Sequence, residues 1–255
     1  MFSYIKSVFS FLLPNYFYNI AGRYYRSLFY FGNKFKCTIC ERSFRKFLPY
    51  GSPISRSNAS CPGCFSLERH RLIWLYLKNK TNLFSDELLV LHFSPEKCIS
   101  DKLRKLANIK YITAEIDHQL PDIDILMNIT SIPSDDNSYD VILCNNVLHH
   151  VLDDMKAMRE LYRVLKPDGW AIIHEGFDRD RKKTFEDPSV TSWEERERLF
   201  NDKDHYRIYG WDFLERLKNA GFIVKEDYFL KQFDQRAIEK YRIFQQPIYL
   251  LLKGS

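Results

Sequence analysis

The chain has 255 residues, of which 45% are hydrophobic and 28% are charged, as in an ordinary folded protein. This length allows one large domain, or one medium domain with a small attachment. No apolar run approaches the roughly 18 residues of a transmembrane helix. The short run 8–13 ends at Pro14 without a small-residue cleavage pattern. We therefore expect neither a membrane span nor a signal peptide.

The net charge of +5 hides a difference between two parts of the chain. Residues 1–85 contain 13 lysines and arginines and two acids, whereas residues 86–255 contain 25 and 31. Opposite signs suggest two modules. We expect the basic, aromatic segment 1–33 to form amphipathic helices packed on the protein. The alternative is an anchor at a membrane surface, because such residues suit anionic headgroups. Nothing directs export, so we expect a cytoplasmic protein, with peripheral contact at the inner face of the membrane as that alternative implies.

Four of the six cysteines form two Cys-x-x-Cys pairs separated by 20 residues: Cys37 and Cys40, and Cys61 and Cys64. This is the spacing of a zinc ribbon, in which each tight turn directs two thiolates at one point. A pair of disulfides would require an oxidising compartment. We predict a zinc-ribbon domain over 34–80, including a helix at 66–78. Four thiolates leave no open coordination position, so its zinc is expected to be structural.

From residue 87 on, strands and helices alternate. We predict strands at 87–93, 110–116, 124–128, 139–145 and 170–174, helices at 95–107 and 154–165, a polar stretch at 177–209, a helix at 210–220, and strands at 223–228 and 248–252. Alternating elements predict an α/β doubly wound sheet, parallel with an antiparallel edge strand, that binds ligands at the carboxyl ends of its strands. This domain is expected to span 85–255, with 177–209 as a lid or binding loop, because polar connections of this length are seldom idle.

The connection between the first strand and the first helix, LHFSPE at 91–96, lacks the usual glycines. Many α/β enzymes bind nucleotides over a glycine-rich loop at this place, yet there is no glycine between Gly63 and Gly169. We predict that Ser94 caps the helix and that Pro95 is its first residue. Together they would fix the turn and leave the helix N-terminus open to an anion.

Residues 128–170, NITSIPSDDNSYDVILCNNVLHHVLDDMKAMRELYRVLKPDGW, resemble the core of class I S-adenosylmethionine-dependent methyltransferases of the type 11 subgroup. The chain is similar, more closely, to a bacterial subfamily with an N-terminal zinc ribbon. The matching segments are FRKFLPYG (44–51), CPGCFSLERHRLIWLYL (61–77), LHFSPE (91–96) and DHYRIYGWDFLERLKNAGF (204–222). The resemblance covers about 34–225 and implies a Rossmann-like domain that uses S-adenosyl-L-methionine.

The resemblance also implies which residues contact the cofactor: His92, Phe93, Ser94, Pro95, Glu115, Asn128, Ile129, Asn145 and Asn146. The methionine carboxylate suits the N-terminus of the first helix, and the ribose diol suits Glu115. Adenine normally meets an acid where this chain has Asn128, whose carbonyl oxygen can accept from the adenine amino group without charge assistance. Asn145 and Asn146 belong to the floor beneath the sulfonium.

Catalytic residues are expected where the fourth strand ends and in the lid. His150 is the candidate general base for a hydroxyl acceptor, because the imidazole pKa of about 6.5 suits that task. His149 stands where relatives often carry Glu, so it is either an acceptor contact or a replacement. A polar junction capped by an aspartate would explain both histidines without catalysis. The lid candidates for acceptor contacts are Glu186, Asp187, His205 and Arg207. The alternative for these residues is a solvated surface helix around 193–198.

The resemblance implies methyl transfer to a hydroxyl or similar nucleophile of a small molecule or glycan. Genes of the subfamily are often associated with bacterial surface-polysaccharide synthesis, which suggests that the acceptor is a sugar hydroxyl. A lipid-linked intermediate, reached from the basic, aromatic N-terminus, is one form that this acceptor could take. An RNA methyltransferase that uses the basic module is the alternative. It is less expected, because CNNV at 144–147 is not the Asn/Asp-Pro-Pro-aromatic motif of base amino methylation and no Pro-Cys nucleophile is present. A binding protein that has lost catalysis is the third hypothesis.

Overall fold

The computed structural model describes residues 25, 27–51, 55–117 and 122–254, and these form two compact units. The first unit contains the described residues up to Thr81, together with Lys97–Lys102 and Leu230–Gln246. The second contains Asn82–Glu96, Leu103–Phe229 and the residues from Pro247 on. Both units are discontinuous in sequence, whereas the domains were predicted as continuous segments. Most of the predicted helical segment 1–33 lies outside the described residues.

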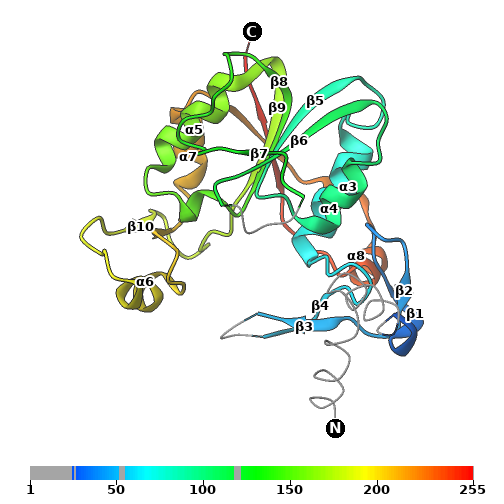
Figure 1. Cartoon of the computed structure of the whole chain (residues 1–255). Helices are drawn as coiled ribbons and strands as arrows, with labels where there is room; N and C mark the ends of the chain where they lie inside the picture. The colour runs from blue at the N-terminus through cyan, green and yellow to red at the C-terminus, as the bar shows by residue number, and fades with distance from the viewer. Residues whose placement is uncertain (1–24, 26, 52–54, 118–121, 255) are drawn as a thin grey trace, which may run out of the picture. The chain divides into compact units, whose positions relative to one another are not determined.

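The first unit is built from two small antiparallel pairs of strands and short helices (Figure 1). Strand β1 (Phe31–Lys36) pairs with β2 (Ser43–Phe44), and β3 (Leu48–Tyr50) pairs with β4 (Arg56–Ser60). The helices are α3 (Glu68–Lys80), α4 (Lys97–Leu103, of which Leu103 belongs to the second unit) and α8 (Gln235–Tyr241). Helix α8 was not predicted. In the described parts of both units, no helix has the length and apolar character that crossing a bilayer requires.

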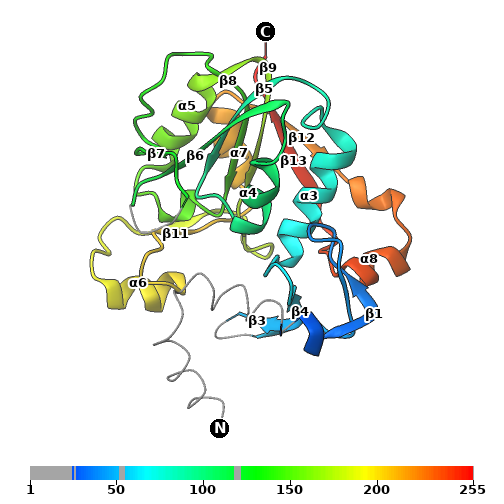
Figure 2. The same cartoon turned by 45° about the vertical axis from the view of Figure 1, so that its right-hand side comes forward.

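A seven-stranded sheet forms the centre of the second unit. Its strands are β5 (Leu88–Phe93), β6 (Ile109–Glu115), β7 (Ile125–Leu126), β8 (Tyr139–Asn145), β9 (Leu165–His174), β12 (Ile223–Asp227) and β13 (Ile248–Leu252). The order is β12-β13-β9-β8-β5-β6-β7, and Figure 2 shows it running from β7 on the left to β12 on the right. Strands β7, β6, β5, β8 and β9 are mutually parallel. The predicted fold class, a Rossmann-like doubly wound sheet, is confirmed.

One detail of the predicted sheet needs correction: the antiparallel strand is not at the edge. Strand β13 runs antiparallel to both of its neighbours, β9 and β12. The chain reaches β12 first and then returns between β12 and β9, so β12 becomes the edge strand. Strand β13 has a neighbouring strand on each side, and its sequence IYLLL has the apolar composition of an inner strand.

Alternate residues of the sheet face a core formed with helices α5 (Asp154–Val164) and α7 (Phe213–Asn219). The residues that share this core include Leu91, Phe93, Ile142, Cys144, Ala171, Ile173 and Leu251 from the strands, and Met158, Leu161, Phe213 and Leu217 from the helices. Both helices lie on the same face of the sheet in Figures 1 and 2. Asp153 caps α5 by accepting the backbone N–H of Lys156 at 2.9 Å.

The predicted lid at 177–209 has secondary structure of its own. Strand β10 (Phe185–Glu186) pairs antiparallel with β11 (Arg207–Ile208), and helix α6 (Trp193–Phe200) lies between them in sequence. Helix α6 begins after Ser192, whose side chain accepts the N–H of Glu195. It coincides with the surface helix expected as the alternative for residues 193–198. The segment is also tied to the end of β8, because Tyr206 N donates to His149 O at 2.9 Å.

Candidate functional site

The carboxyl ends of three neighbouring strands form one edge of the sheet. Phe93 of β5 lies opposite Ala114 of β6 on one side and Cys144 of β8 on the other. The residues that follow, Ser94, Glu115 and Asn145, are therefore placed next to one another. This is the edge at which open α/β sheets bind ligands. Three of the predicted cofactor residues are thus brought together by the register of the strands.

The glycine-free loop adopts a glycine-like backbone at Ser94. Its φ is +44°, in the left-handed region that favours glycine. The hydroxyl of Ser94 donates to Glu115 Oε2, so the side chain that makes the backbone costly also anchors it. Ser94 is therefore not the helix cap that we predicted. Helix α4 begins at Lys97, two residues later than expected, and Pro95 is not its first residue.

Glu115 ends β6 and is half-buried. Its Oε1 accepts the N–H of Ile116 at 2.9 Å, and its Oε2 accepts the Ser94 hydroxyl. A carboxylate has about four acceptor positions, so two remain for a ligand. This geometry suits two adjacent hydroxyl donors, as the predicted ribose contact requires.

His92 lies inside the sheet rather than in the loop. Its side chain is fully buried, with Nδ1 2.8 Å from Tyr111 Oη and Nε2 3.1 Å from Glu96 Oε2. Asn145 Nδ2 donates to the same Glu96 oxygen at 3.4 Å. Phe93 is also buried, at 3% exposure, in the core with α5. The side chains of His92 and Phe93 pack beneath the surface and support the loop. The direct contacts with the cofactor that were predicted for these side chains do not fit their buried positions.

Asn128 and Ile129 depart from the predicted adenine contact in different ways. The carbonyl oxygen of Asn128 already accepts both the N–H and the hydroxyl of Thr130, each at 2.9 Å. This local turn uses both acceptor positions, so the amide nitrogen is the group that exposed Asn128 presents. Ile129 is 6% exposed and packs in the core, which leaves its backbone for a ligand.

Asn145 and Asn146 end β8. Asn145 is 3% exposed, and its Oδ1 has no hydrogen-bond partner among the described residues. Because a buried carbonyl oxygen without a donor costs free energy, this atom marks a place for a ligand donor. Asn146 has φ +54°, and its N–H donates to His174 O at 2.7 Å. Its left-handed backbone begins the turn into the next short helix.

That helix, η1 (Leu148–His150), places His149 and His150 beside His205 of the lid. The ring centroids are 4.2 Å apart for His149 and His150, 4.3 Å for His149 and His205, and 4.8 Å for His150 and His205. All three histidines were predicted site residues, but nothing in the sequence indicated that they lie together. Burial, and after it the neighbouring ring of His149, lowers the pKa of both His150 and His205 below the ordinary value. Both rings are therefore neutral at pH 7.

Glu175 is the residue that organises this cluster, and we did not predict it. It is 2% exposed; its Oε1 accepts the N–H groups of Val147 and Leu148 at 2.8 Å each, and its Oε2 bonds to His149 Nδ1. One carboxylate thus fixes both the start of η1 and the ring of His149. The available signal was an acid directly after the fifth strand, at the carboxyl edge of the sheet.

Arg207 is buried and fully engaged, so the predicted acceptor contact does not fit it. Its guanidinium donates to Leu148 O at 2.9 Å, to Val151 O at 2.5 Å and to Leu152 O at 2.8 Å, and to Glu186 at 2.9 Å. Glu186 also bonds to Arg216 at 3.0 Å. Arg207 thus holds the lid to the turn after η1, and Glu186 links the lid to Arg216 of α7. Asp187 is exposed and accepts locally from Ser189.

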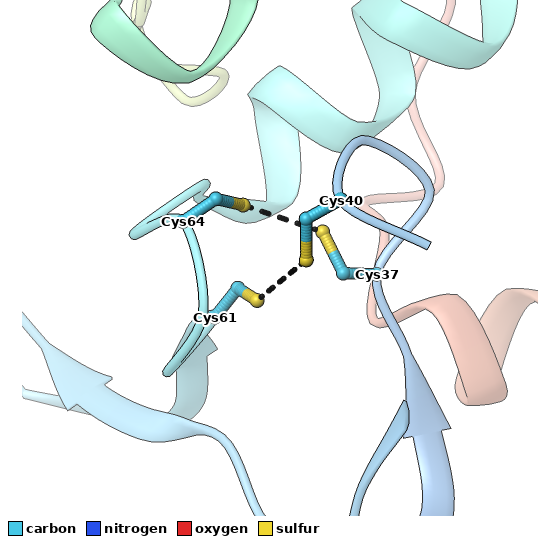
Figure 3. Close-up of side chains that lie close together, drawn as sticks. All are labelled: Cys37, Cys40, Cys61 and Cys64. Atoms are coloured by element: carbon cyan, nitrogen blue, oxygen red, sulfur yellow. Dashed lines mark hydrogen bonds between the residues drawn. The ribbon is translucent and has the colours of Figure 1, made fainter. Parts of the chain in front are cut away.

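The four predicted zinc ligands form one cluster in the first unit (Figure 3). The sulfur of Cys37 lies 3.6 Å from that of Cys64, and Cys40 lies 3.7 Å from Cys61. These separations match the edge of about 3.8 Å in a tetrahedron with Zn–S bonds of about 2.3 Å. All six cysteines are free, so the disulfide alternative is wrong. The donor set fits a closed, structural Zn²⁺.

A buried arginine lies behind this cluster. Arg71 is fully buried, and its guanidinium donates to Ser66 O, Ala59 O, Tyr241 O and Arg242 O at 2.5–3.2 Å. Burial lowers its pKa, while the charges of Cys37 and Cys61 act in the opposite direction. A Zn²⁺ with four thiolates carries two negative charges, which would compensate the guanidinium. Arg71 also fastens residues 241–242, far away in sequence, to the cysteine-bearing segment.

Comparison with known proteins identifies a domain in the middle of the chain. Residues 93–173 match the family model described as "Methyltransferase domain". These residues form a methyltransferase domain. S-adenosylmethionine is the cofactor of this methyltransferase family, and the predicted class I methyltransferase domain is confirmed.

The relatives share only part of their length with this chain. The "Uncharacterized methyltransferase YcgJ" of Bacillus subtilis is 34% identical over 97 residues, which are 38% of this chain and 36% of the relative. The "Ubiquinone/menaquinone biosynthesis C-methyltransferase UbiE" of Haemophilus ducreyi is 35% identical over 78 residues, 29% and 25% of the two chains. The chain thus spans about a quarter to a third of the length of these curated relatives. The solved structure of Bacillus subtilis YcgJ aligns with 16% identity and a TM-score of 0.49, covering 73% of this chain and 100% of that one.

Proposed function

We propose that this chain is an S-adenosylmethionine-dependent methyltransferase that methylates a hydroxyl oxygen of a small molecule or glycan. The cluster of His149, His150 and His205 carries the proposal. Two of its members, His149 and His150, follow the carboxyl end of β8, with His149 three positions beyond Asn146, at the edge where this fold binds its ligands. Neutral imidazoles at that place are groups that can polarise a hydroxyl or accept its proton.

The residues at the sheet edge fit the cofactor by their unused hydrogen-bonding capacity. Glu115 would receive the ribose diol on its two free acceptor positions. The orphaned Oδ1 of Asn145 would accept from the amino group of the methionine moiety, and the amide nitrogen of Asn128 would donate to the adenine ring. When bound, S-adenosylmethionine supplies an electrophilic methyl carbon, and transfer yields the methylated acceptor, S-adenosylhomocysteine and one proton.

The protein's own part is to exclude water and to manage that proton. The segment with β10, α6 and β11 is held against η1 by Arg207 and by the bond from Tyr206 N to His149 O, so it forms one wall of the acceptor side. Glu175 fixes the His149 ring that faces it. Holding the acceptor in line with the methyl carbon is the main source of acceleration for such an activated donor.

A sugar hydroxyl on a lipid-linked carrier is the acceptor class that we propose. Large apolar side chains are exposed at the described end of the N-terminal segment: Tyr25 at 74%, Leu28 at 63%, Phe29 at 69% and Phe31 at 76%. Together with the basic charge of that segment, they suit a lipid surface. Sedimentation with anionic vesicles should therefore remove more of the wild type than of a Phe29→Ser/Phe31→Ser variant. Equal sedimentation would contradict this contact.

The function is tested first by calorimetry with S-adenosylmethionine. We expect saturable binding that weakens about tenfold in Glu115→Gln, because a neutral amide replaces a charged acceptor. Glu226→Gln, on the far edge strand β12, is the matched control and should bind as the wild type does. If no heat is measured at millimolar S-adenosylmethionine, the proposed function is wrong. The remaining hypothesis would then be a binding protein that does not use this cofactor.

Transfer is then measured with labelled methyl groups offered to lipid-linked saccharides, to the free sugars and to RNA. Label in a saccharide supports the proposal, whereas label confined to RNA favours an RNA methyltransferase whose basic module binds the RNA. Magnetic resonance of the product separates an O-methyl from a C-methyl group, the latter being the activity in the name of the UbiE relatives. His150→Ala should keep cofactor affinity and lower turnover; unchanged turnover would remove His150 from the site.

A further inference from the structure

The nitrogen atoms of the histidine cluster are arranged as metal ligands are. One ring nitrogen from each of His149, His150 and His205 lies within 4.8 Å of the others. The three residues come from two segments more than 50 positions apart in sequence. Chance surface histidines repel one another when protonated, so a packed trio needs a physical reason.

The tautomer of each ring follows from its partner at Nδ1. His150 Nδ1 lies 3.1 Å from the backbone oxygen of Asp204, and His205 Nδ1 lies 3.2 Å from that of Phe200. His149 Nδ1 bonds to the Glu175 carboxylate. All three partners can only accept, so each Nδ1 carries the proton. In a neutral ring the lone pair is then on Nε2.

No hydrogen bond to any of these three Nε2 atoms occurs within the described parts of the chain. The cluster therefore presents three lone pairs and no donor between them. A carboxylate or backbone carbonyl behind each Nδ1 is also what orients metal-binding imidazoles and raises their basicity. The pattern is repeated three times, once for each ring.

The surrounding charge favours a cation. Glu175 is buried behind His149, and Asp202 interacts electrostatically with all three rings. Asp202 is held near them because its Oδ1 accepts Asp204 N at 3.0 Å and its backbone oxygen accepts His205 N at 3.2 Å. Arg207, two residues after His205, directs its guanidinium at carbonyl oxygens and Glu186.

We propose that His149, His150 and His205 bind one divalent transition-metal ion through their Nε2 atoms. Three imidazoles select Zn²⁺ and similar ions over Mg²⁺ or Ca²⁺, which prefer oxygen ligands. Three protein ligands leave a coordination position open, as in catalytic zinc sites and unlike the closed cysteine cluster. Nitrogens bonded to one ion at about 2.0–2.1 Å lie about 3.4 Å apart. One nitrogen of each ring already lies within 4.8 Å of the others, so small movements of the rings would complete the site.

The ion's role rests on the proposed methyl transfer, whereas its binding does not. A hydroxyl oxygen of the acceptor would occupy the open position, and the ion would lower the pKa of that hydroxyl as it does for bound water. The released proton leaves to solvent beside His150, which is the most exposed of the three rings. The oxygen then keeps the lone pair that forms the new bond to carbon. His150 acts here through the ion and not as a free base.

The test counts zinc in the full, untagged chain after equilibrium dialysis against micromolar Zn²⁺. We expect two equivalents in the wild type, and one in both His150→Ala and His205→Ala. The equivalent that remains in the cysteine cluster reports that the first unit is folded, and unchanged amide-exchange protection of β8 reports that the second unit is folded. His174→Gln, a histidine at the end of β9 outside the cluster, is the matched control and should keep two. Glu175→Gln should weaken the second equivalent by about 10- to 100-fold.

One equivalent in the wild type, or two in the histidine variants, would overturn the metal site. Because neither cofactor nor acceptor is present, this result is independent of catalysis. A chain with two zinc ions that does not bind S-adenosylmethionine would refute the proposed function and keep the metal site. A chain that methylates its acceptor with one zinc, at a rate unaffected by a mild chelator, would keep the function and refute the metal site.

Discussion

Replacing Ser94 separates the two roles of this residue in the glycine-free loop. The backbone at Ser94 has φ +44°, and its hydroxyl donates to Glu115. Both Ser94→Ala and Ser94→Gly remove the hydroxyl, so the lost hydrogen bond is common to the two variants. They differ in the Cβ atom alone, which makes their comparison a direct measure of the backbone strain.

The sign of that difference follows from two opposing magnitudes. A Cβ in the left-handed region costs about 1–2 kcal/mol. Glycine costs about 0.5–1 kcal/mol relative to alanine through the entropy of the unfolded chain. We therefore expect Ser94→Gly to be more stable than Ser94→Ala by about 0.5–1 kcal/mol, or about 1–4 °C in Tm for a chain of this size.

The assay is urea unfolding followed by tryptophan fluorescence, since three of the four tryptophans (Trp170, Trp193 and Trp211) lie in the second unit. The same two substitutions at Ser131, an exposed position without positive φ, provide the control and should give the opposite order. If Ser94→Gly is the less stable variant by 0.5 kcal/mol or more, the loop does not hold a strained backbone, and the explanation for the missing glycine is wrong.

Three further predictions concern the stability of the two units. Removing zinc, or Cys61→Ser, should abolish amide-exchange protection in β1–β4 and α3 while β8 stays protected, because binding to four thiolates is worth about 10–16 kcal/mol; protected metal-free hairpins would contradict a folding role. Arg71→Met should destabilise the first unit by about 3 kcal/mol or more, since two buried and two partly buried carbonyls lose their donor, and urea unfolding of the zinc-loaded protein measures this against Arg69→Met. The bonds from Arg163 lower the pKa of Glu160. The ion pair therefore stabilises the fold above the unfolded pKa of about 4.3, and this stabilisation is lost as the pH falls through the lower folded pKa. Glu160→Gln should flatten the plot of stability against pH in that range, and an unchanged plot would exclude the pair as the source of the dependence.

Local spacing explains what could be predicted from the sequence. The two Cys-x-x-Cys turns are each four residues long, so their geometry is fixed within the segment that carries them. Strand β8, YDVILCN, was predicted with its observed bounds because a largely apolar run has few other places in an α/β domain. Glu115 was placed at the sheet edge by the resemblance to the methyltransferase family, and it is the last residue of the parallel strand β6.

The predictions were wrong where a contact between residues far apart in the sequence determines the local structure. Nothing in LHFSPE shows that Ser94 reaches Glu115, 21 residues away, and this bond holds the left-handed backbone that postpones the helix to Lys97. Arg207 was expected to contact an acceptor because it lies in the polar segment that was predicted to be a lid on the acceptor side. Its burial results from carbonyls 55 to 59 residues earlier. The meeting of His205 with His149 has the same origin and could not be read from spacing.

The cofactor edge and the histidine cluster share their supports, which has a thermodynamic consequence. The end of β9 holds both, because His174 O accepts Asn146 N and the next residue, Glu175, fixes η1 and His149. Drawing the three rings onto an ion must therefore move or stiffen the turn that carries Asn145 and Asn146. Binding free energies coupled in this way are reciprocal. Zinc at the cluster should change the affinity for S-adenosylmethionine by some factor, and the cofactor should change the affinity for the second zinc by that same factor. Calorimetric titrations in both orders would measure the two factors, and a cycle with no coupling would show that η1 does not transmit the movement.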